Sequence, residues 1–421
     1  MKLVMRQNQN TLTDDQKYDF ARAVRALKSM GTYDEFFVKV HLDSRHADGS
    51  NDAHSGPAFF PWHREFLRRF EGALQYAAER SGIADSDLLG LPYWDWSVDR
   101  YPNSSIWGSS GFLGGNGTTN DGQVTNGPFA QKSGWTLTYT IASEEPTNYL
   151  KRQFGSLRQP PISLPTPEWV QAALRAAPYD ASPWNASSRS GFRNLTEGWI
   201  QAPQMHNLVH VWVGGSMEPI TSPNDPVFFL HHCFVDKLWA DWQSLHPNEE
   251  RYLPDGGAAP GHNLRDAMRP WDQENETVTP EDVLDHRALG YRYDTESYLQ
   301  ANEDLYPTQY IWSPSRKYSL NYYDDGSLWL NKEPQNTTEP DWNPVWNSPG
   351  RESLHSPDCM CSMQSDGNLV SYDPKGGVIW PSGTNTTQNK GCYLWVSDDG
   401  YVELYRSGAS NPFWRNGKLL P

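Results

Sequence analysis

The feature that most constrains this chain is a histidine-rich stretch in its middle. His206 and His210 are four residues apart, so a helix places both side chains on one face. A Gly-Gly break at residues 214–215 separates them from a mostly apolar segment that contains His231 and His232. Imidazoles on the buried faces of two neighbouring helices are typical of a metal site. The stretch therefore predicts one half of such a site.

The apolar segment carries the signals of a helix start. Asn224 or Asp225 is suited to the N-cap, and Pro226 is suited to the first helical position. Asp236 follows His232 by four residues and so shares its face of the helix. A carboxylate in that place can anchor the ring of a metal ligand from behind.

Length and charge narrow the possible classes of protein. A chain of 421 residues is expected to form two or three domains. Its net charge of −16 argues against nucleic acid or an anionic membrane as the main partner. No apolar run reaches the roughly 18 residues of a membrane span, and the N-terminus lacks the apolar core of a signal peptide. The sequence leaves open a cytoplasmic location and export by a route not encoded in this chain.

The chain has two regions with different sequence patterns. Helical apolar spacing dominates residues 1–295, with helices expected to begin after Thr13 and at Pro61, and strand patterns are sparse there. We therefore expect a mainly α, helical-bundle domain over these residues. Residues 296–307 are expected to form a linker. Residues 308–421 show Asp-Gly turns and alternating apolar residues, which predict an all-β domain.

The all-β part contains an internal repeat. An Asp-Gly pair opens an equivalent strand at residues 325, 366 and 399. The three units end in Trp346, Trp380 and Trp414, and both spacings between these residues are 34. Because one short-strand unit cannot bury a core by itself, we expect the three units to enclose one core with the three Trp side chains at its centre.

The second half of the metal site is expected in the first hundred residues. The candidates are His41 at the end of a helix, His54 on a loop and His63 in the first turn of the next helix. Three imidazoles per half, without a thiolate or paired carboxylates, suit copper or zinc rather than magnesium or calcium. Two metals with three ligands each keep open positions for a bridging molecule.

These motifs resemble the tyrosinases of the type-3 dicopper family, in their short bacterial or fungal form. The resemblance covers about residues 5–295 and rests on residues 54–64, 91–96, 206–215 and 222–239. It implies one copper on His41, His54 and His63 and a second on His206, His210 and His232. It also implies that His231 lies beside the site, that Asp236 accepts a proton from a ligand ring, and that Phe228 forms an apolar wall.

The resemblance implies an activity as well. Tyrosinases use two copper ions and dioxygen to hydroxylate monophenols at the ortho position and to oxidise catechols to o-quinones. In the family a Glu and an Asn hold a water that assists loss of the phenol proton, and the matching residues here are Glu197 and Asn207. Some relatives carry a Cys two residues before the second ligand, where it forms a thioether bridge. This chain has Asp52 there, so no such crosslink is expected.

Several alternative functions share the six-histidine site. One is an o-aminophenol or catechol oxidase without hydroxylase activity. Another is a zinc-containing enzyme of secondary metabolism with non-redox chemistry, because imidazole binds both metals. A dioxygen carrier and a lectin with a vestigial helical domain are the remaining alternatives.

The C-terminal domain has a resemblance of its own. Residues 364–372 are similar to the mannose-binding motif of bulb-type lectins, whose fold is a threefold β-prism, and the resemblance covers roughly residues 308–421. It implies sugar contacts by the motif residues Gln364, Asp366, Asn368, Val370 and Tyr372. Only the middle repeat is complete, so one sugar site at most is expected. The alternative is a β-prism kept for packing or for covering the copper site.

Overall fold

The computed structural model describes residues 3–108, 112–144, 146–200, 204–334 and 343–420. The chain divides into two compact units. One unit comprises residues 7–289, and the other joins residues 1–6 to residues 290–421. Within the described ranges, none of the helices has the length and apolarity that a membrane crossing demands.

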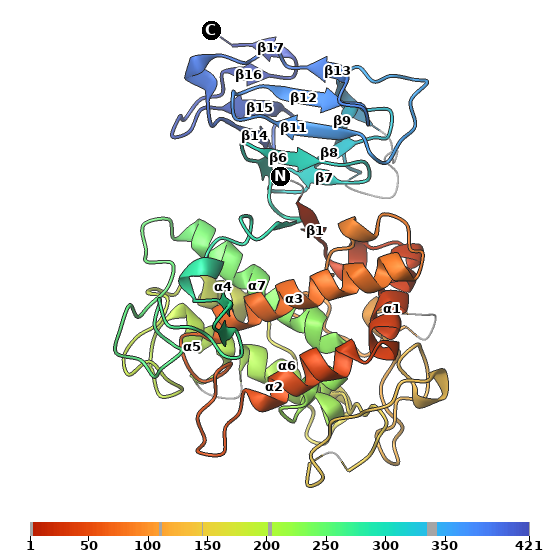
Figure 1. Cartoon of the computed structure of the whole chain (residues 1–421), viewed down its shortest axis with the longest axis vertical. Helices are drawn as coiled ribbons and strands as arrows, with labels where there is room; N and C mark the ends of the chain where they lie inside the picture. The colour runs from red at the N-terminus through yellow and green to blue at the C-terminus, as the bar shows by residue number, and fades with distance from the viewer. Residues whose placement is uncertain (1–2, 109–111, 145, 201–203, 335–342, 421) are drawn as a thin grey trace. The chain divides into compact units, whose positions relative to one another are not determined.

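The described α-helices all belong to the unit of residues 7–289, which confirms the predicted mainly helical domain (Figure 1). They are α1 (Asp14–Ser29), α2 (Lys39–Asp43), α3 (Phe59–Arg80), α4 (Pro167–Leu174), α5 (Phe192–Glu197), α6 (Met205–Val213) and α7 (Val227–Leu245). A π-helical turn, Asp34–Val38, leads into α2. The unit also contains a short hairpin of β2 (Asp272–Gln273) and β3 (Glu276–Thr277) and several 3-10 turns.

The core of the helical unit forms where α3 packs along α7 (Figure 1). Phe70 of α3 and Phe229 of α7 stack with their ring centroids 3.4 Å apart. Helix α3 begins at Phe59, two residues earlier than expected, because Pro61 in a first turn sacrifices no intrahelical hydrogen bond. Helix α1 begins as predicted, with a capping box between Thr13 and Gln16.

A buried ion pair fixes the start of α7. Arg152 and Asp225 are both fully buried, with Nε of the arginine 2.7 Å from the carboxylate. The guanidinium also donates to the carbonyls of Leu113 and Gly114, which holds the long loop that follows the first helices. The Asp225 carboxylate in turn accepts from the amide of Val227, the first residue of α7. The N-cap itself is Pro226, one residue later than predicted, and Asp225 accepts from the first helical amide from the position before it, braced by the arginine.

The second unit is built from three antiparallel sheets. The first sheet has the order β10-β9-β8-β7, with β7 (Tyr310–Trp312), β8 (Tyr318–Tyr322), β9 (Leu328–Lys332) and β10 (Pro344–Asn347). The second has the order β13-β12-β11-β6, with β6 (Glu303–Leu305), β11 (Met360–Met363), β12 (Leu369–Tyr372) and β13 (Val378–Pro381). The third has the order β17-β16-β15-β14-β5, with β5 (Tyr298–Leu299), β14 (Tyr393–Val396), β15 (Val402–Tyr405), β16 (Trp414–Arg415) and β17 (Lys418–Leu419).

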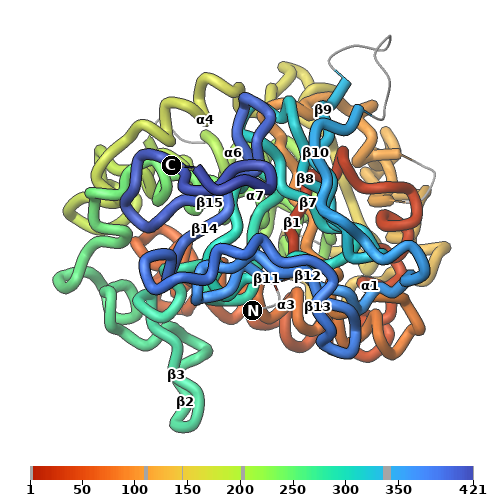
Figure 2. The backbone as a smooth tube through the Cα atoms, turned by 90° about the horizontal axis from the view of Figure 1, so that it is seen from above, coloured from red at the N-terminus to blue at the C-terminus, as the bar shows by residue number. Residues whose placement is uncertain are grey.

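The three sheets form the sides of a prism around one apolar centre (Figure 2). The rings of Trp346, Trp380 and Trp414 meet there, with centroids 5.9, 6.0 and 6.2 Å apart. This confirms the predicted threefold β-prism, and the three Trp rings contact one another as predicted. Trp414 is buried in the core, whereas Trp346 and Trp380 are partly buried and pack against it. The Asp-Gly turns are also as predicted, because Gly326, Gly367 and Gly400 have φ of 80°, 92° and 80°, which favours glycine.

The boundary between the units differs from the expected linker at residues 296–307. β5 and β6 lie within that segment and pair with β14 and β11. Strands of two or three residues are too short to show an alternating pattern, which explains why the sequence did not reveal them. The N-terminus also joins the second unit, since β1 (Val4–Arg6) pairs in parallel with β4 (Tyr291–Tyr293).

Candidate metal centre

Six of the predicted ligands gather into two groups in the helical unit. His41 of α2, His54 of the following loop and His63 of α3 form the first group. His206 and His210 of α6 and His232 of α7 belong to the second. Within each group the candidate ligand atoms all lie within 4.8 Å of one another. The four-residue spacing on α6 and the packing of α6 against α7 produce this convergence.

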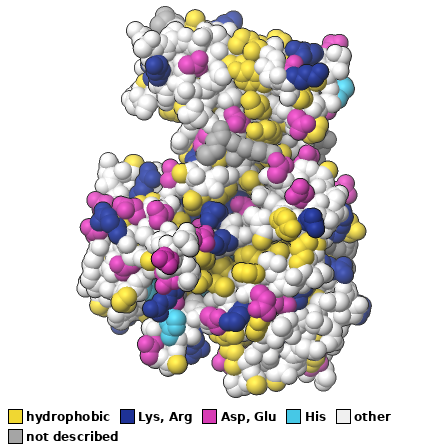
Figure 3. Space-filling view, viewed as in Figure 1, with side chains coloured by type: hydrophobic (Ala, Val, Ile, Leu, Met, Phe, Trp, Pro, Cys, Tyr) yellow, Lys and Arg dark blue, Asp and Glu magenta, His cyan; other side chains and the backbone are white. Residues whose placement is uncertain are grey.

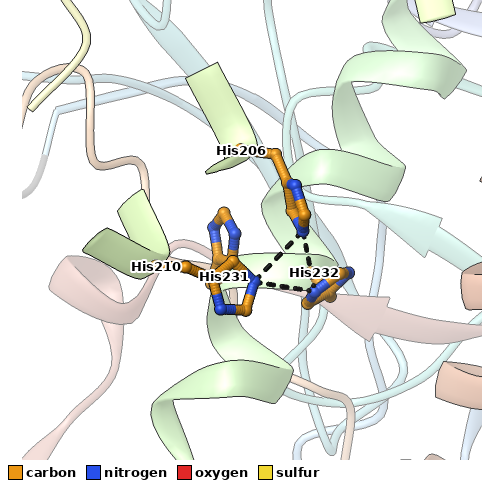
Figure 4. Close-up of side chains that lie close together, drawn as sticks. All are labelled: His206, His210, His231 and His232. Atoms are coloured by element: carbon orange, nitrogen blue, oxygen red, sulfur yellow. Dashed lines mark hydrogen bonds between the residues drawn. The ribbon is translucent and has the colours of Figure 1, made fainter. Parts of the chain in front are cut away.

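The second group has the geometry of a metal triad (Figure 4). The Nε2 atoms of His206, His210 and His232 are 3.1, 3.3 and 3.4 Å apart. Ligand nitrogens at about 2.0–2.1 Å from one metal with tetrahedral angles are separated by about 3.3 Å. The triad is therefore spaced as ligands of a single ion would be.

Hydrogen bonds on the far side of the rings fix the tautomers of the first group. Nδ1 of His41 lies 2.6 Å from the carbonyl oxygen of Ile220, and Nδ1 of His63 lies 2.8 Å from that of Phe59. A carbonyl oxygen only accepts, so each Nδ1 carries the hydrogen and each Nε2 carries a lone pair. Both Nε2 atoms are buried without a hydrogen-bond partner in the described part of the chain. Such lone pairs are suited to a metal ion.

The same logic applies to the second group. Nδ1 of His210 lies 2.7 Å from the carbonyl oxygen of Met217, and Nδ1 of His206 lies 3.1 Å from Oδ1 of Asn207. Their Nε2 atoms are then acceptors, and acceptors do not form hydrogen bonds with one another at such short separations. A cation at their centre removes the repulsion. The residues present thus fit a bound metal.

Burial keeps these imidazoles neutral. It lowers the pKa of His41 to about 3 and that of His210 to about 4, with the hydrogen bonds to Ile220 and Met217 opposing the effect only in part. Burial, together with the charges of neighbouring histidines, also lowers the pKa of His54, His63 and the remaining members of the second group. Neutral nitrogen donors without a thiolate suit copper.

His231 is buried within the second group, where a ring nitrogen lies within 4.8 Å of the candidate ligand atoms of the other three histidines, but among the described residues no contact at hydrogen-bond distance joins it to them. Its ring lies parallel to that of His206, with centroids 5.0 Å apart. The contacts in Figure 4 connect the other three rings and leave His231 aside. The adjacency of His231 and His232 on α7 explains this, because adjacent helical residues point about 100° apart.

Phe228 covers the site on one side. Its ring stacks on that of His232 with centroids 4.1 Å apart and lies 5.0 Å from the ring of His41. It therefore contacts members of both groups. An apolar wall at this place excludes water from the centre.

Asp236 has a different main partner from the one expected. Its Oδ1 accepts from Nε of Arg64 at 2.6 Å, and both side chains are buried. Nδ1 of His232 has no hydrogen-bond partner among the described residues, so Asp236 does not anchor that ring. Arg64 also donates to the carbonyls of Val283 and Leu284. The pair therefore ties α3 to α7 and to the end of the helical unit.

Glu197 is fully buried at the end of α5, behind the loop that carries His54. Its Oε1 accepts from the amide of Ser55 at 2.6 Å, and its Oε2 accepts from Nη1 of Arg193 at 3.0 Å. Arg193 also pairs with Asp180 at 2.8 Å. Burial raises the pKa of Glu197, and the charge of Arg193 lowers it in part.

A pocket of about 700 Å³ opens onto the two groups. It is lined by four of the predicted ligands (His41, His54, His206 and His210) together with Asn207, and its rim includes Arg45, Trp199 and Glu218. Sequence reasoning did not single out Arg193, Asp180 or the rim residues. Arginine and aspartate are mostly surface residues, and only burial in the fold distinguishes these two.

Comparisons with known proteins agree with this site. Residues 31–245 match the family model described as the common central domain of tyrosinase. The chain is 45% identical over 298 residues to a tyrosinase from Streptomyces glaucescens, covering 70% of this chain and all of the relative.

Solved structures give likenesses for both units. A polyphenol oxidase from Thermothelomyces thermophila is 24% identical, with a TM-score of 0.51 over 69% of this chain and 88% of its own. The mannose-specific agglutinin from snowdrop bulbs is 26% identical, with a TM-score of 0.22 over 30% of this chain and all of its own. The family model over residues 31–245 and the 45% identity to a tyrosinase covered over its full length show that the chain belongs to the tyrosinase family.

Proposed function

We propose that the six histidines hold two copper ions as two triads, and that Glu197 and Asn207 assist the proton transfer that hydroxylation of a monophenol requires. The observation that carries the first part is the set of buried Nε2 lone pairs without hydrogen-bond donors. The bound copper pair supplies the redox chemistry by which tyrosinases oxidise phenols with dioxygen. The remaining steps belong to residues of this chain.

Substrate binding is assigned to the pocket of about 700 Å³. A phenol ring enters between the loop of His54 and the start of α6, with its hydroxyl directed toward the two triads. Phe228 lies beneath the site against His41 and His232 and keeps water away from the ring. The catechol formed by hydroxylation leaves as an o-quinone.

A monophenol has a further requirement, because a free phenol has a pKa of about 10 and must lose its proton. We assign this proton to a water held between Glu197 and Asn207. Each oxygen of Glu197 already accepts one hydrogen bond but has a second lone pair for a water. Asn207 lines the pocket, and its Oδ1 is engaged by His206, so its amide group is the free donor.

The test compares a monophenol with its catechol in the copper-loaded enzyme. Glu197→Gln removes the negative charge and keeps the shape, so hydroxylation of 4-methylphenol should fall by about 100-fold. Oxidation of 4-methylcatechol should change little, because the water of Glu197 is assigned to the proton of the monophenol and not to the two protons that a catechol loses on oxidation. Initial rates of oxygen uptake measure both reactions.

Glu218→Gln is the matched control, since Glu218 lines the same pocket at its rim. It should leave the ratio of the two rates unchanged. An equal loss of both reactions in Glu197→Gln would contradict the assigned role.

One observation favours the alternative of catechol oxidation alone, namely that Ser55 and Arg193 already engage both oxygens of Glu197. Absence of 4-methylphenol hydroxylation by the unaltered enzyme would establish that alternative.

We further propose one mannose-type sugar site on the β-prism unit, at the motif on β11 and β12. The support is local geometry. The amide of Gln364 donates to the Tyr372 hydroxyl at 2.7 Å, which leaves that hydroxyl free to donate to a ligand. The Asn368 carbonyl oxygen accepts from Ser382 and from the amide of Thr384, so its amide hydrogens stay available. Val370 is only 2% exposed and offers little surface to a sugar ring.

A further inference from the structure

The pocket above the two triads has two charged residues in its lining, Arg45 and Glu218. Its other lining residues are uncharged side chains and the candidate copper ligands. The charge that a substrate meets at the rim is therefore decided by this pair. The two residues differ in how far their charges are compensated.

Glu218 is compensated by a basic neighbour. Its Oε1 accepts from Nη2 of Arg158 at 2.8 Å. Nε of Arg158 also donates to the carbonyl of Gln153, so the arginine is held in place. The negative charge at the rim is thus paired.

Arg45 has no such partner. Within the described residues, no ion pair joins its guanidinium to a carboxylate. The acidic residues nearest in sequence are all engaged elsewhere. Asp43 pairs with Lys39, Asp48 accepts from Ser50, and Asp52 pairs with His46 at 2.7 Å. The rim therefore has an uncompensated positive charge.

The backbone fixes Arg45 relative to the metal centre. Arg45 forms an antiparallel bridge with Asn51, which closes a small hairpin at the edge of the pocket. The side chain of Asn51 accepts from the amide of His54 at 3.0 Å and lies 3.2 Å from Nδ1 of the same residue. Asn51 thus connects the hairpin that carries Arg45 to the predicted copper ligand His54.

A cation at this rim is at odds with the general charge of the protein. The chain has a net charge of −16, and Figure 3 shows acidic side chains widely spread over the helical unit between Lys and Arg side chains. The overall field therefore does not favour anions. A local preference for an anionic substrate has to come from residues at the pocket itself.

We propose that Arg45 is a specificity-determining residue that favours phenols and catechols with a carboxylate on the side chain opposite the hydroxyl group. The guanidinium pairs with that carboxylate at the rim while the ring lies over the triads, and it disfavours substrates with an ammonium group there. The inference rests on phenols entering this pocket. It does not depend on the proton transfer assigned to Glu197.

The test uses the copper-loaded full chain and three catechols that differ in side-chain charge. They are 3-(3,4-dihydroxyphenyl)propionate, its neutral methylamide and 2-(3,4-dihydroxyphenyl)ethylamine. In Arg45→Gln, kcat/KM for the carboxylate relative to the amide should fall by about fivefold, the size expected of an exposed ion pair. The change should appear in KM. Arg45→Glu should reverse the preference toward the amine, and Arg45→Lys should keep most of the preference for the carboxylate.

Lys39→Gln is the control, because it removes a cation of α2 that is paired with Asp43 and does not line the pocket. It should leave all three ratios unchanged. Raised salt should weaken the preference of the unaltered enzyme and not that of Arg45→Gln. An unchanged ratio of carboxylate to amide in Arg45→Gln would overturn the proposal. An equal loss on the amide would also overturn it, because it would assign Arg45 to the integrity of the site. If the unaltered enzyme oxidised none of the three catechols, the proposed function of phenol oxidation would be contradicted, whatever the role of Arg45.

Discussion

At the scale of the residue, the position of hydrogens on the imidazoles decides what the site can bind. We assign His232 as the ligand in the second triad and His231 as its buried neighbour, although both belong to α7 and to the same group of close imidazoles. His232→Asn should reduce the copper content after dialysis from about two ions per chain to about one, since a site with two imidazoles holds its metal weakly. Metal analysis by mass spectrometry measures the content directly.

His231→Asn is the natural comparison for that variant. The residue is equally buried, so the substitution imposes a similar disturbance on α7. It should leave about two copper ions per chain, because among the described residues neither ring nitrogen of His231 has a polar contact with the three close Nε2 atoms of the triad. If His231→Asn lost a copper ion and His232→Asn retained both, the assignment of the ligand would be reversed.

Residue patterns predicted the six ligands but not what orients them. The spacing of His206 and His210 and the place of His63 in a first turn were sufficient to bring the ligands together in the expected groups. The partners of their Nδ1 atoms include the backbone carbonyls of Ile220 and Met217. Every residue has a carbonyl, so a sequence does not distinguish those that serve a ligand ring from the others.

At the scale of the element, a single glycine sets the distance between α5 and α6. Gly198 follows Glu197 with φ of +100°, and a Cβ there would lie 1.9 Å from the carbonyl oxygen of Gln204, next to the start of α6. Gly198→Ala should therefore lower the free energy of unfolding by about 3 kcal/mol, combining backbone strain with displacement of that turn. Copper binding by the triad on α6 and α7 should weaken as well. Denaturant unfolding and metal analysis provide the two measurements.

Gly134→Ala is the control that separates backbone strain from the steric contact of the added Cβ. Its φ of +91° is similar, but nothing lies within 4 Å of an added Cβ. Gly134→Ala should thus show only the backbone strain, about 1 kcal/mol, with copper binding intact. Equal effects of the two substitutions would mean that the contact between Gly198 and Gln204 has no special role in the site.

Elements with long periodic patterns were predicted well, and very short ones were not. α1, α3 and α7 carry apolar residues over several turns, so their existence follows from spacing. β5 and β6 have two and three residues, and their places depend on partners in β14 and β11 that are far away in sequence. Pairing of that kind is a property of the assembled sheet.

At the scale of the whole molecule, each of the two units has its own core and its own candidate chemistry. The metal centre lies entirely within residues 7–289, and the motif at residues 364–372 lies entirely in the β-prism unit. The first residues of the chain nevertheless belong to the second unit, where Leu3 and Met5 are buried. That parallel pairing of β1 with β4 was not predicted, because a strand of three residues gives no signal of its distant partner.

This separation leads to a prediction for sugar binding by the full chain. If the β11 and β12 motif binds mannose, retention on a mannose matrix should persist after copper has been removed by a chelator. Tyr372→Phe should weaken retention by about tenfold, because it removes one hydroxyl that can donate to the sugar, together with the hydrogen bond that this hydroxyl accepts from Gln364. Tyr405→Phe is the matched control, since Tyr405 occupies the equivalent place on β15 and its hydroxyl donates to Glu403. Absence of retention in all three proteins would show that the prism packs without binding mannose, and equal retention of all three would contradict the role of Tyr372. Loss of retention with copper would instead place the sugar contact in the helical unit.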